Sequence, residues 1–184
     1  MKVAVGCDHR GFEGKRTLIP LLKKMGHHVH DFGCDSTAAC DYPDFAGAVA
    51  RAVVSGEHEV GILLDGSGIG MSVAANKVYG ARAALVHDEV TARLAREYNH
   101  CNVLCIGTDL LSHDAMRKIV EIFLTCPFME GRHTRRVNQI HQIELDSIGA
   151  HRENPHHSAS PAAAPAAVST PVTVVHRVAA TSAR

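Results

Sequence analysis

The sequence predicts an α/β protein, and three observations lead to that fold class. Short apolar or β-branched runs alternate with amphipathic stretches of helical length from residue 2 to residue 124. Most runs are apolar throughout, which is typical of strands buried on both faces of a parallel sheet. Polar residues follow several runs directly, where ligands of such sheets bind. The expected architecture is a Rossmann-like three-layer α/β/α sandwich with a five-stranded parallel sheet.

The predicted elements follow one another in a regular order. The strand candidates are the short apolar or β-branched runs at residues 2–8, 28–32, 60–64, 81–87 and 103–107. The helical candidates are the amphipathic stretches at residues 13–25, 44–54, 71–77, 89–98 and 114–124. Each strand is short and is followed by a helix, as right-handed crossovers require. A last helix opens at Gly131 and reaches about residue 148.

Length and composition restrict the class of protein. A chain of 184 residues has room for one domain with a substantial core. Lys plus Arg and Asp plus Glu both total 19, and Trp is absent, so nothing favours a nucleic-acid partner. No apolar run approaches the roughly 20 residues of a membrane span, and the N-terminus lacks the apolar core of a signal peptide. We expect a cytoplasmic protein without a membrane partner.

Cysteine and histidine are frequent but do not form a recognisable ligand pattern. The six cysteines contain no CxxC pair, so we expect reduced, buried thiols. The 14 histidines are scattered, and no HExxH or similar spacing occurs. The sequence therefore predicts no metal site and no cofactor.

The most informative segment is the glycine-rich stretch after the third predicted strand. That strand delivers Asp65 into the turn Gly66-Ser67-Gly68-Ile69-Gly70, and a helix opens directly behind it. Glycines let a backbone approach a ligand, and the amides of such a turn form an anion cradle. A carboxylate beside it suits proton abstraction next to a carbonyl, because the resulting enediolate must be held. The alternative is that the glycines serve only close packing.

Two further strand ends are polar, and a basic cluster opens the last helix. Asp8-His9-Arg10 ends the first strand and His87-Asp88 the fourth, so both are expected at the edge that holds Asp65. A capping or hydrogen-bonding pair is the alternative for each. The run 131–136 places basic residues in a first helical turn, which is unfavourable there unless an anion binds. It is a phosphate clamp, a subunit contact or a solvated charged face.

The composition changes at about residue 149. Residues 154–167 form a linker rich in Pro, Ala and Ser, which cannot support a core. In the last segment, residues 170–184, Val172, Val175, Val178 and Ala179 would form one apolar stripe if the segment became helical. We therefore divide the chain into a domain of residues 1–148 and a tail of 149–184. The tail is either disordered or a tethered docking peptide for an assembly partner.

Four motifs together resemble a known family. They are Gly6-Cys-Asp8-His9, Asp41-Tyr42-Pro43-Asp44-Phe45, Gly66 to Lys77 and Gly131-Arg132-His133-x-Arg135-Arg136. In this order and spacing they resemble the type B ribose-5-phosphate isomerases, which are related to the galactose-6-phosphate isomerase subunits. The resemblance covers about residues 1–148. It implies homodimers or tetramers with the active site at the subunit interface, and aldose–ketose isomerisation through a cis-enediolate without a metal. The default substrate pair is ribose 5-phosphate and ribulose 5-phosphate.

The resemblance also implies roles for individual residues. At the family's base position stands Asp65, whose carboxylate is competent to act as the catalytic base, and near the family's acid position either Tyr98 or His100 would be the acid. Asp8 and His9 would contact substrate hydroxyls and phosphate, Tyr42 would line the ring-opening side, and Asn99 would bind a hydroxyl near the reacting carbons. Arg132 and Arg136 would bind the substrate phosphate of the other subunit's site, so that each site receives these arginines from its partner. The residues of the loop expected to bind substrate are Gly66, Ser67, Gly68, Gly70 and Ser72.

Three positions depart from the family pattern. In relatives the base is either a Cys at the position of Asp65 or a Glu further along the loop, at the position of Met71. Tyr98 replaces a His, and His100 follows Asn99 on another helical face. Asp109 stands where many relatives have a phosphate-binding Arg, so it either turns away or pairs with a hydroxyl or a nearby arginine. These departures leave open a different four- or six-carbon sugar phosphate, or a non-catalytic binding or scaffold protein recruited by its tail.

Deletion of residues 150–184 tests the tail hypothesis. We expect isomerase activity to stay nearly unchanged, because the tail lies outside the predicted catalytic domain, and co-sedimentation with any partner assembly to disappear. Kinetics and sedimentation of full-length and truncated protein measure both effects. Loss of folding on truncation would contradict the idea of a tether.

Overall fold

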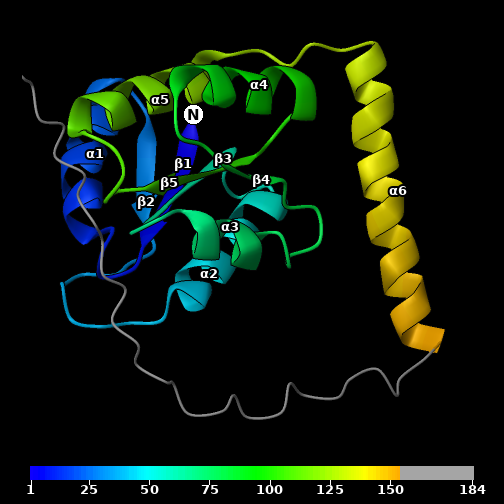
Figure 1. The fold of residues 1–184 in the computed structure, drawn as a ribbon, viewed down its shortest axis with the longest axis horizontal. Coiled ribbons are helices and arrows are strands. Elements are labelled where there is room, and N and C mark those ends of the chain that lie inside the picture. The colour runs from blue at the N-terminus through cyan, green and yellow to red at the C-terminus, as the bar shows by residue number, and fades with distance from the viewer. Residues whose placement is uncertain (154–184) are drawn as a thin grey trace, which may run out of the picture. The chain divides into compact units, whose positions relative to one another are not determined.

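The computed structural model describes residues 1–153 and contains one parallel sheet of five strands in the order β2-β1-β3-β5-β4 (Figure 1). The strands are β1 (Lys2–Cys7), β2 (His28–Asp31), β3 (Val60–Asp65), β4 (Ala83–Leu85) and β5 (Val103–Gly107). All four neighbouring pairs are parallel, so every strand ends at the same edge of the sheet. The predicted fold class is confirmed.

Helices cover both faces of this sheet (Figure 1). These helices are α1 (Phe12–Lys24), α2 (Tyr42–Val54), α3 (Ile69–Ala75), α4 (Glu89–Asn99) and α5 (His113–Thr125). A sixth helix, α6 (Arg132–Glu153), follows them in the sequence and belongs to neither core cluster. The apolar side chains of α2 and α3 pack into one core cluster with Ala4, Leu63 and Val103 of the strands. Those of α1, α4 and α5 pack into a second cluster with Val5, Ile62 and Leu104. The alternation of side chains along each strand therefore supplies both cores.

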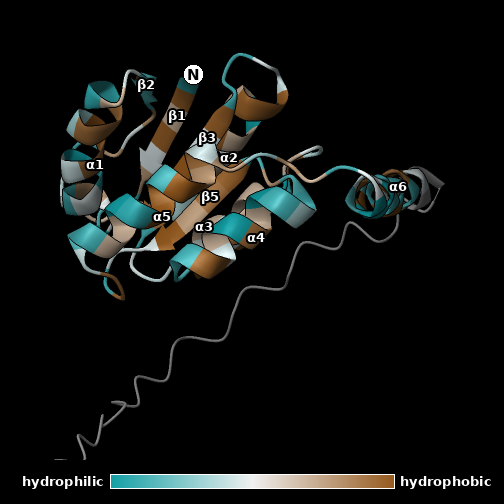
Figure 2. Ribbon diagram, turned by 90° about the horizontal axis from the view of Figure 1, so that it is seen from above, coloured by the Kyte–Doolittle hydropathy of each residue, from teal (hydrophilic) through white to brown (hydrophobic). Residues whose placement is uncertain are grey.

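The central strands are the most hydrophobic part of the fold, and the polar residues of the helices face outward (Figure 2). All six residues of β3 are buried, as are five of the six in β1. Asp65 is the last residue of β3 and remains buried, with 5% of its surface exposed. The strand thus carries a carboxylate to the edge of the sheet inside a fully packed layer.

Most element boundaries agree with the prediction to within about two residues. Helix α2 begins at Tyr42, not residue 44, because Pro43 fits the first helical turn. Strand β4 keeps only Ala83–Leu85 of the predicted 81–87. Helix α6 continues to Glu153, beyond the predicted end at about 148. The predicted linker and docking segment, residues 154–184, lie outside the described residues.

No helix among residues 1–153 is long and apolar enough to cross a bilayer.

Replacement of Phe123 tests the core beneath α5. Phe123 is fully buried, and the Arg96 guanidinium lies 5.3 Å from its ring centre. We expect Phe123→Ala to lower the free energy of unfolding by about 3–5 kcal/mol, because it opens a cavity and removes this contact. Val90→Ala, at a position 64% exposed, should stay within about 0.5 kcal/mol of wild type. Urea unfolding of both variants measures the difference, and similar losses would contradict the core assignment.

Candidate active site

A cavity of about 410 Å³ lies beyond the carboxyl ends of the two central strands. The chain leaves β1 towards β2 and leaves β3 towards β4, on opposite sides of the sheet, so their ends form a topological switch point. Six residues predicted from the sequence line this cavity: Asp8, Tyr42, Asp65, Gly66, Ser67 and Gly70. Arg10 and Asp109, which the sequence placed near the site without a role in substrate binding, also line it, and so does Leu110, which we did not predict.

The Asp65 carboxylate holds its own loop. Its Oδ1 accepts hydrogen bonds from the amide of Ser67, at 2.9 Å, and from that of Gly68. Its Oδ2 accepts a longer hydrogen bond, 3.3 Å, from the Met71 amide in the first turn of α3. The expectation that the loop amides together face a ligand is therefore wrong for three of them, because they bind Asp65. The backbone at Gly66 and Gly70 still lines the cavity.

Two loop glycines have different functions. Gly68 has φ of +78°, and a Cβ there would collide with the Leu85 side chain and lie 3.0 Å from the Gly107 amide nitrogen. Close packing against β5 therefore explains Gly68. For this residue, the alternative that the loop glycines serve packing is confirmed. At Gly70 a Cβ would lie 2.8 Å from the Tyr42 ring. Gly70 thus allows Tyr42 to lie against the loop at the cavity wall.

Asp8, at the end of β1, likewise binds backbone amides of its own turn and lines the cavity. Its Oδ1 accepts hydrogen bonds from the amides of Arg10 and Gly11, both at 2.9 Å. Its Oδ2 lies 4.0 Å from Nδ1 of His9, and that nitrogen accepts a hydrogen bond from the Cys40 amide at 3.4 Å. Asp8 therefore fixes the turn and also presents a carboxylate to the cavity. His9 lies beside it.

Arg10 and Asp109 form an ion pair across the loop. A Cβ at Gly66 would lie 2.6 Å from Nε of Arg10 and 2.8 Å from Oδ2 of Asp109, so the pair covers Gly66 closely. Pairing with a nearby arginine was one of the expected outcomes for Asp109, and it is confirmed. The sequence placed Arg10 at this strand end with Asp8 and His9, but only the structure shows its ion pair with Asp109.

The remaining loop and strand-end residues contribute locally. Ser72 lies one turn into α3, and its amide donates to the Gly68 carbonyl at 3.1 Å. Asp88 caps α4, since its side chain accepts a hydrogen bond from the Thr91 amide at 2.7 Å. Neither His87 nor Asp88 is among the residues lining the cavity. The end of β4 lies at the same edge of the sheet as Asp65, as expected, but the capping alternative is the one confirmed for Asp88, because its carboxylate binds the first turn of α4.

Tyr98, Asn99 and His100 lie at the opposite edge of the sheet from Asp65, where the strands begin. Helix α4 runs back from the carboxyl edge, so its last residues reach the start of β5. The His100 carbonyl accepts hydrogen bonds from the Arg82 guanidinium, directly before β4. The stretch from Asn102 to Gly107, which pairs with Asp65, spans about 16 Å at ~3.3 Å per residue. One chain therefore does not bring these groups together.

The predicted phosphate clamp lies at that same opposite edge. The Tyr98 ring stacks on the buried His133 ring, with centroids 4.3 Å apart. Arg132 Nε lies 3.3 Å from Nε2 of His133, and Arg136 follows one helical turn later. Burial lowers the pKa of His133, and the two neighbouring arginines lower it further. Tyr98 and the arginines thus form one cluster.

His100 points to a different environment. It ends α4 in the left-handed conformation, with φ of 48°, and its ring stacks on Phe128 at 4.5 Å. Burial lowers the pKa of His100, and Arg82 and Arg96 lower it further. Of the two candidate acids, Tyr98 is the one that stacks on the ring beside Arg132.

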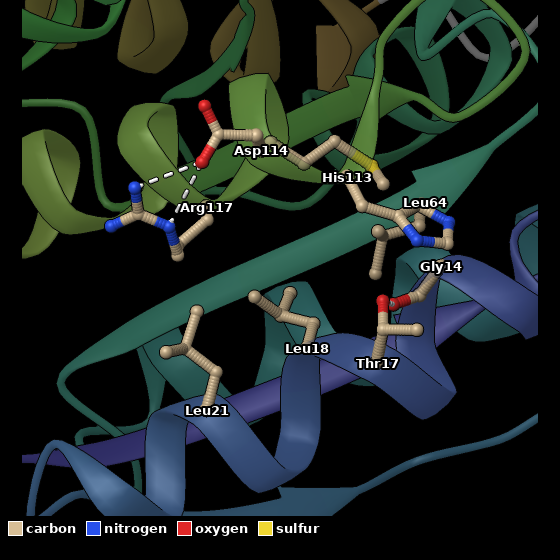
Figure 3. A pocket seen from close by; sticks show the side chains of 9 residues that line it. Gly14, Thr17, Leu18, Leu21, Leu64, His113, Asp114 and Arg117 are labelled. Atoms are coloured by element: carbon tan, nitrogen blue, oxygen red, sulfur yellow. Dashed lines mark hydrogen bonds and ion pairs between the residues drawn. The ribbon is translucent and has the colours of Figure 1, made fainter.

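A further hollow of about 330 Å³ lies between α1 and α5 (Figure 3). Its wall is mostly apolar and includes Leu18, Leu21 and Leu64. The charged groups there, Asp114 and Arg117, are paired at 2.9 Å. No residue predicted for the active site lines it, and we do not assign the active site to it.

Comparison with known proteins identifies the family. The family model described as Ribose/Galactose Isomerase matches residues 3–140. The chain belongs to this family. It is an aldose–ketose isomerase, and its central cavity occupies the position where ligands bind in such sheets.

The chain matches individual relatives over almost the whole length of each relative. Ribose-5-phosphate isomerase B of Escherichia coli is 41% identical over 143 residues, 78% of this chain and 96% of the relative. The solved ribose-5-phosphate isomerase B of Clostridium thermocellum is 44% identical, with a TM-score of 0.79, over 80% of this chain and 99% of that one. The enzyme of Mycoplasma genitalium, solved with bound ribulose-5-phosphate, is 40% identical with a TM-score of 0.75, over 78% and 96%.

Asp65→Asn tests the structural role of the carboxylate. An Asn side chain has one acceptor oxygen, and its NH₂ group cannot accept from the loop amides. We expect the free energy of unfolding to fall by about 1.5–3 kcal/mol, the range for hydrogen bonds to a charged group. Asp109→Asn, which weakens an exposed ion pair, should cost at most about 1 kcal/mol. Chemical denaturation measures both, and equal small losses would contradict this role.

Proposed function

We propose that this isomerase interconverts ribose 5-phosphate and ribulose 5-phosphate through a cis-enediolate without a metal. The observation that supports it most directly is the cavity at the switch point, where a buried carboxylate lies beside a glycine-rich loop. Relatives named ribose-5-phosphate isomerase B, one of them solved with ribulose-5-phosphate, support the choice of substrate.

Asp65 is the base in this proposal and transfers the proton between C1 and C2. Its Oδ2 has one long hydrogen bond, 3.3 Å from the Met71 amide, and keeps lone-pair capacity for a substrate proton. The backbone at Gly66 and Gly70 stabilises the enediolate oxygen. Asp8, His9, Tyr42 and Ser67 bind the sugar hydroxyls around it.

A second subunit completes the site in this proposal. Tyr98, Asn99, Arg132 and Arg136 belong to an edge about 16 Å away along the sheet, so only a partner chain can bring its copies of these residues to Asp65. The exposed Ile140 and Leu145 of α6 are consistent with a subunit contact. The partner's arginines then bind phosphate, and Tyr98 of the partner subunit is the acid for ring opening. The assembly is a homodimer or tetramer with the site at the interface.

One observation favours a second candidate within the same reaction class. The Arg10–Asp109 pair covers the loop at a position where the family resemblance implies a phosphate-binding arginine. In this pair Asp109 supplies no cation for phosphate and occupies the guanidinium of Arg10, which favours a four- or six-carbon sugar phosphate bound in a different orientation. Initial rates with four-, five- and six-carbon aldose phosphates distinguish the two, and the highest kcat/KM identifies the substrate.

Complementation between inactive variants tests the shared site. We expect Asp8→Asn and Arg132→Ala each to lose most activity, and a one-to-one co-expression to recover about one quarter of it, because half of the dimers then contain one intact site. Co-expression of Asp8→Asn with Asp65→Asn is the matched control and should recover nothing, since both changes lie in one half of the site. Recovery in the control alone, or in neither mixture, would contradict the proposal.

Asp65→Asn also tests the base. We expect kcat to fall by about 10²–10⁴-fold, the usual contribution of a positioned base, with substrate still bound. The assay is run well below the unfolding temperature of the variant, and ribose 5-phosphate affinity is measured separately by calorimetry. Full activity of Asp65→Asn would show that another group is the base.

A further inference from the structure

A second polar hollow, of about 340 Å³, lies beside the edge strand β2 at the amino end of the sheet. His28 and His30 of β2 line it, together with Glu57 and His58 from the turn that follows α2. His28 and His30 are two residues apart on a strand, so both side chains lie on the same face. The hollow therefore collects imidazoles and a carboxylate from two separate segments.

Three of these side chains lie close enough to share one ion. His30, Glu57 and His58 each offer a ligand atom, and these atoms all lie within 4.8 Å of one another. The ring centroids of His30 and His58 are 5.2 Å apart. Ligands of a tetrahedral Zn²⁺ lie about 3.4 Å apart at bond lengths near 2.1 Å. His30 and Glu57 are exposed, so rotation of their side chains can close the remaining gap.

His58 is the fixed member of the cluster. Only 6% of its surface is exposed, its backbone amide donates to the Ala52 carbonyl at 3.0 Å, and its ring meets Phe32 edge-on at 5.5 Å. Its buried Nδ1 has no hydrogen-bond partner among the described residues. A buried imidazole without a hydrogen bond costs free energy, and a metal ion is a partner that such a ring can take.

We propose that His30, Glu57 and His58 bind one divalent transition-metal cation of the Zn²⁺ type. Two imidazoles and one carboxylate are a ligand set that suits Zn²⁺ and its neighbours, whereas Mg²⁺ and Ca²⁺ require more oxygen ligands. Lys2 also lines the hollow, and its positive charge opposes a cation. The Glu57 carboxylate and Glu59, whose Oε1 accepts from the Lys2 amide at 2.9 Å, offset that charge.

The site stabilises the fold and takes no part in isomerisation. Lys2 pairs with His28 at the start of β1, and Asp8 follows the end of that strand. The stretch from Lys2 to Cys7 spans about 16 Å at ~3.3 Å per residue, so the cation and the catalytic cavity are at opposite edges. A bound ion would join the edge strand β2 to the turn between α2 and β3. The ligands His30 and Glu57 are 27 residues apart in the sequence. The proposal is therefore independent of the proposed substrate.

Zinc binding to the full chain tests the site. We expect calorimetry of metal-free protein with ZnCl₂ to give a site occupied by one ion per chain. The melting temperature should rise by about 5–10 °C when zinc is present at roughly 100 times its dissociation constant. His30→Gln and Glu57→Gln, both at exposed positions, should each weaken binding at least about tenfold and so reduce the rise in melting temperature at the same zinc concentration to about half or less. Isomerase activity should be the same with zinc and with chelator.

The matched control addresses the other histidines of the chain. The double variant His156→Gln and His157→Gln removes an adjacent pair in the tail and should keep both the affinity and the melting shift. The proposal is overturned if zinc does not bind below about millimolar concentration, if His30→Gln and Glu57→Gln bind as tightly as wild type, or if the tail variant loses the site. Circular dichroism of each variant confirms that it is folded before binding is compared.

Discussion

The hydrogen bonds between the Asp65 carboxylate and its own loop are the constraint on which the site depends. Strand β3 is buried along its whole length and ends at this carboxylate. The amides of Ser67, Gly68 and Met71 all point to Asp65, so the turn is shaped around a charge. A buried charge is tolerated only when it is hydrogen-bonded. The same contacts fix the loop backbone that lines the cavity and hold the proposed base in place.

The parallel sheet imposes the second constraint. Its strands all end at one edge, which gathers Asp8, Asp65 and their loops into one cavity. The helices must run back, so α4 delivers Tyr98 and Asn99 to the other edge, next to the start of α6. Polar groups therefore form two separate clusters on one chain. A catalytic site that uses both clusters requires two chains, which links the proposed activity to assembly.

Polar side chains at strand ends serve structure before chemistry in this fold. Asp88 is a helix cap, Asp8 holds a turn while it lines the cavity, and Asp109 is neutralised by Arg10. A strand-end motif alone does not distinguish these roles, because the sequence shows which residues are adjacent but not which amides their oxygens accept. The cluster of His30, Glu57 and His58 is the reverse case, since its members share no local motif and meet only through the fold.

The sequence by itself determined the α/β class, the order of the elements and most of the cavity-lining residues, because apolar periodicity, helix caps and glycine turns depend on near neighbours along the chain. Strand β4, the start of α2 and the end of α6 differed from the prediction by a few residues. Only the tertiary structure decided that amides of the glycine-rich loop bind the Asp65 carboxylate, and that Arg10 pairs with Asp109. It also decided that Tyr98 and Arg132 lie at the opposite edge of the sheet. These features join residues distant in sequence, and strand order and burial fix such contacts.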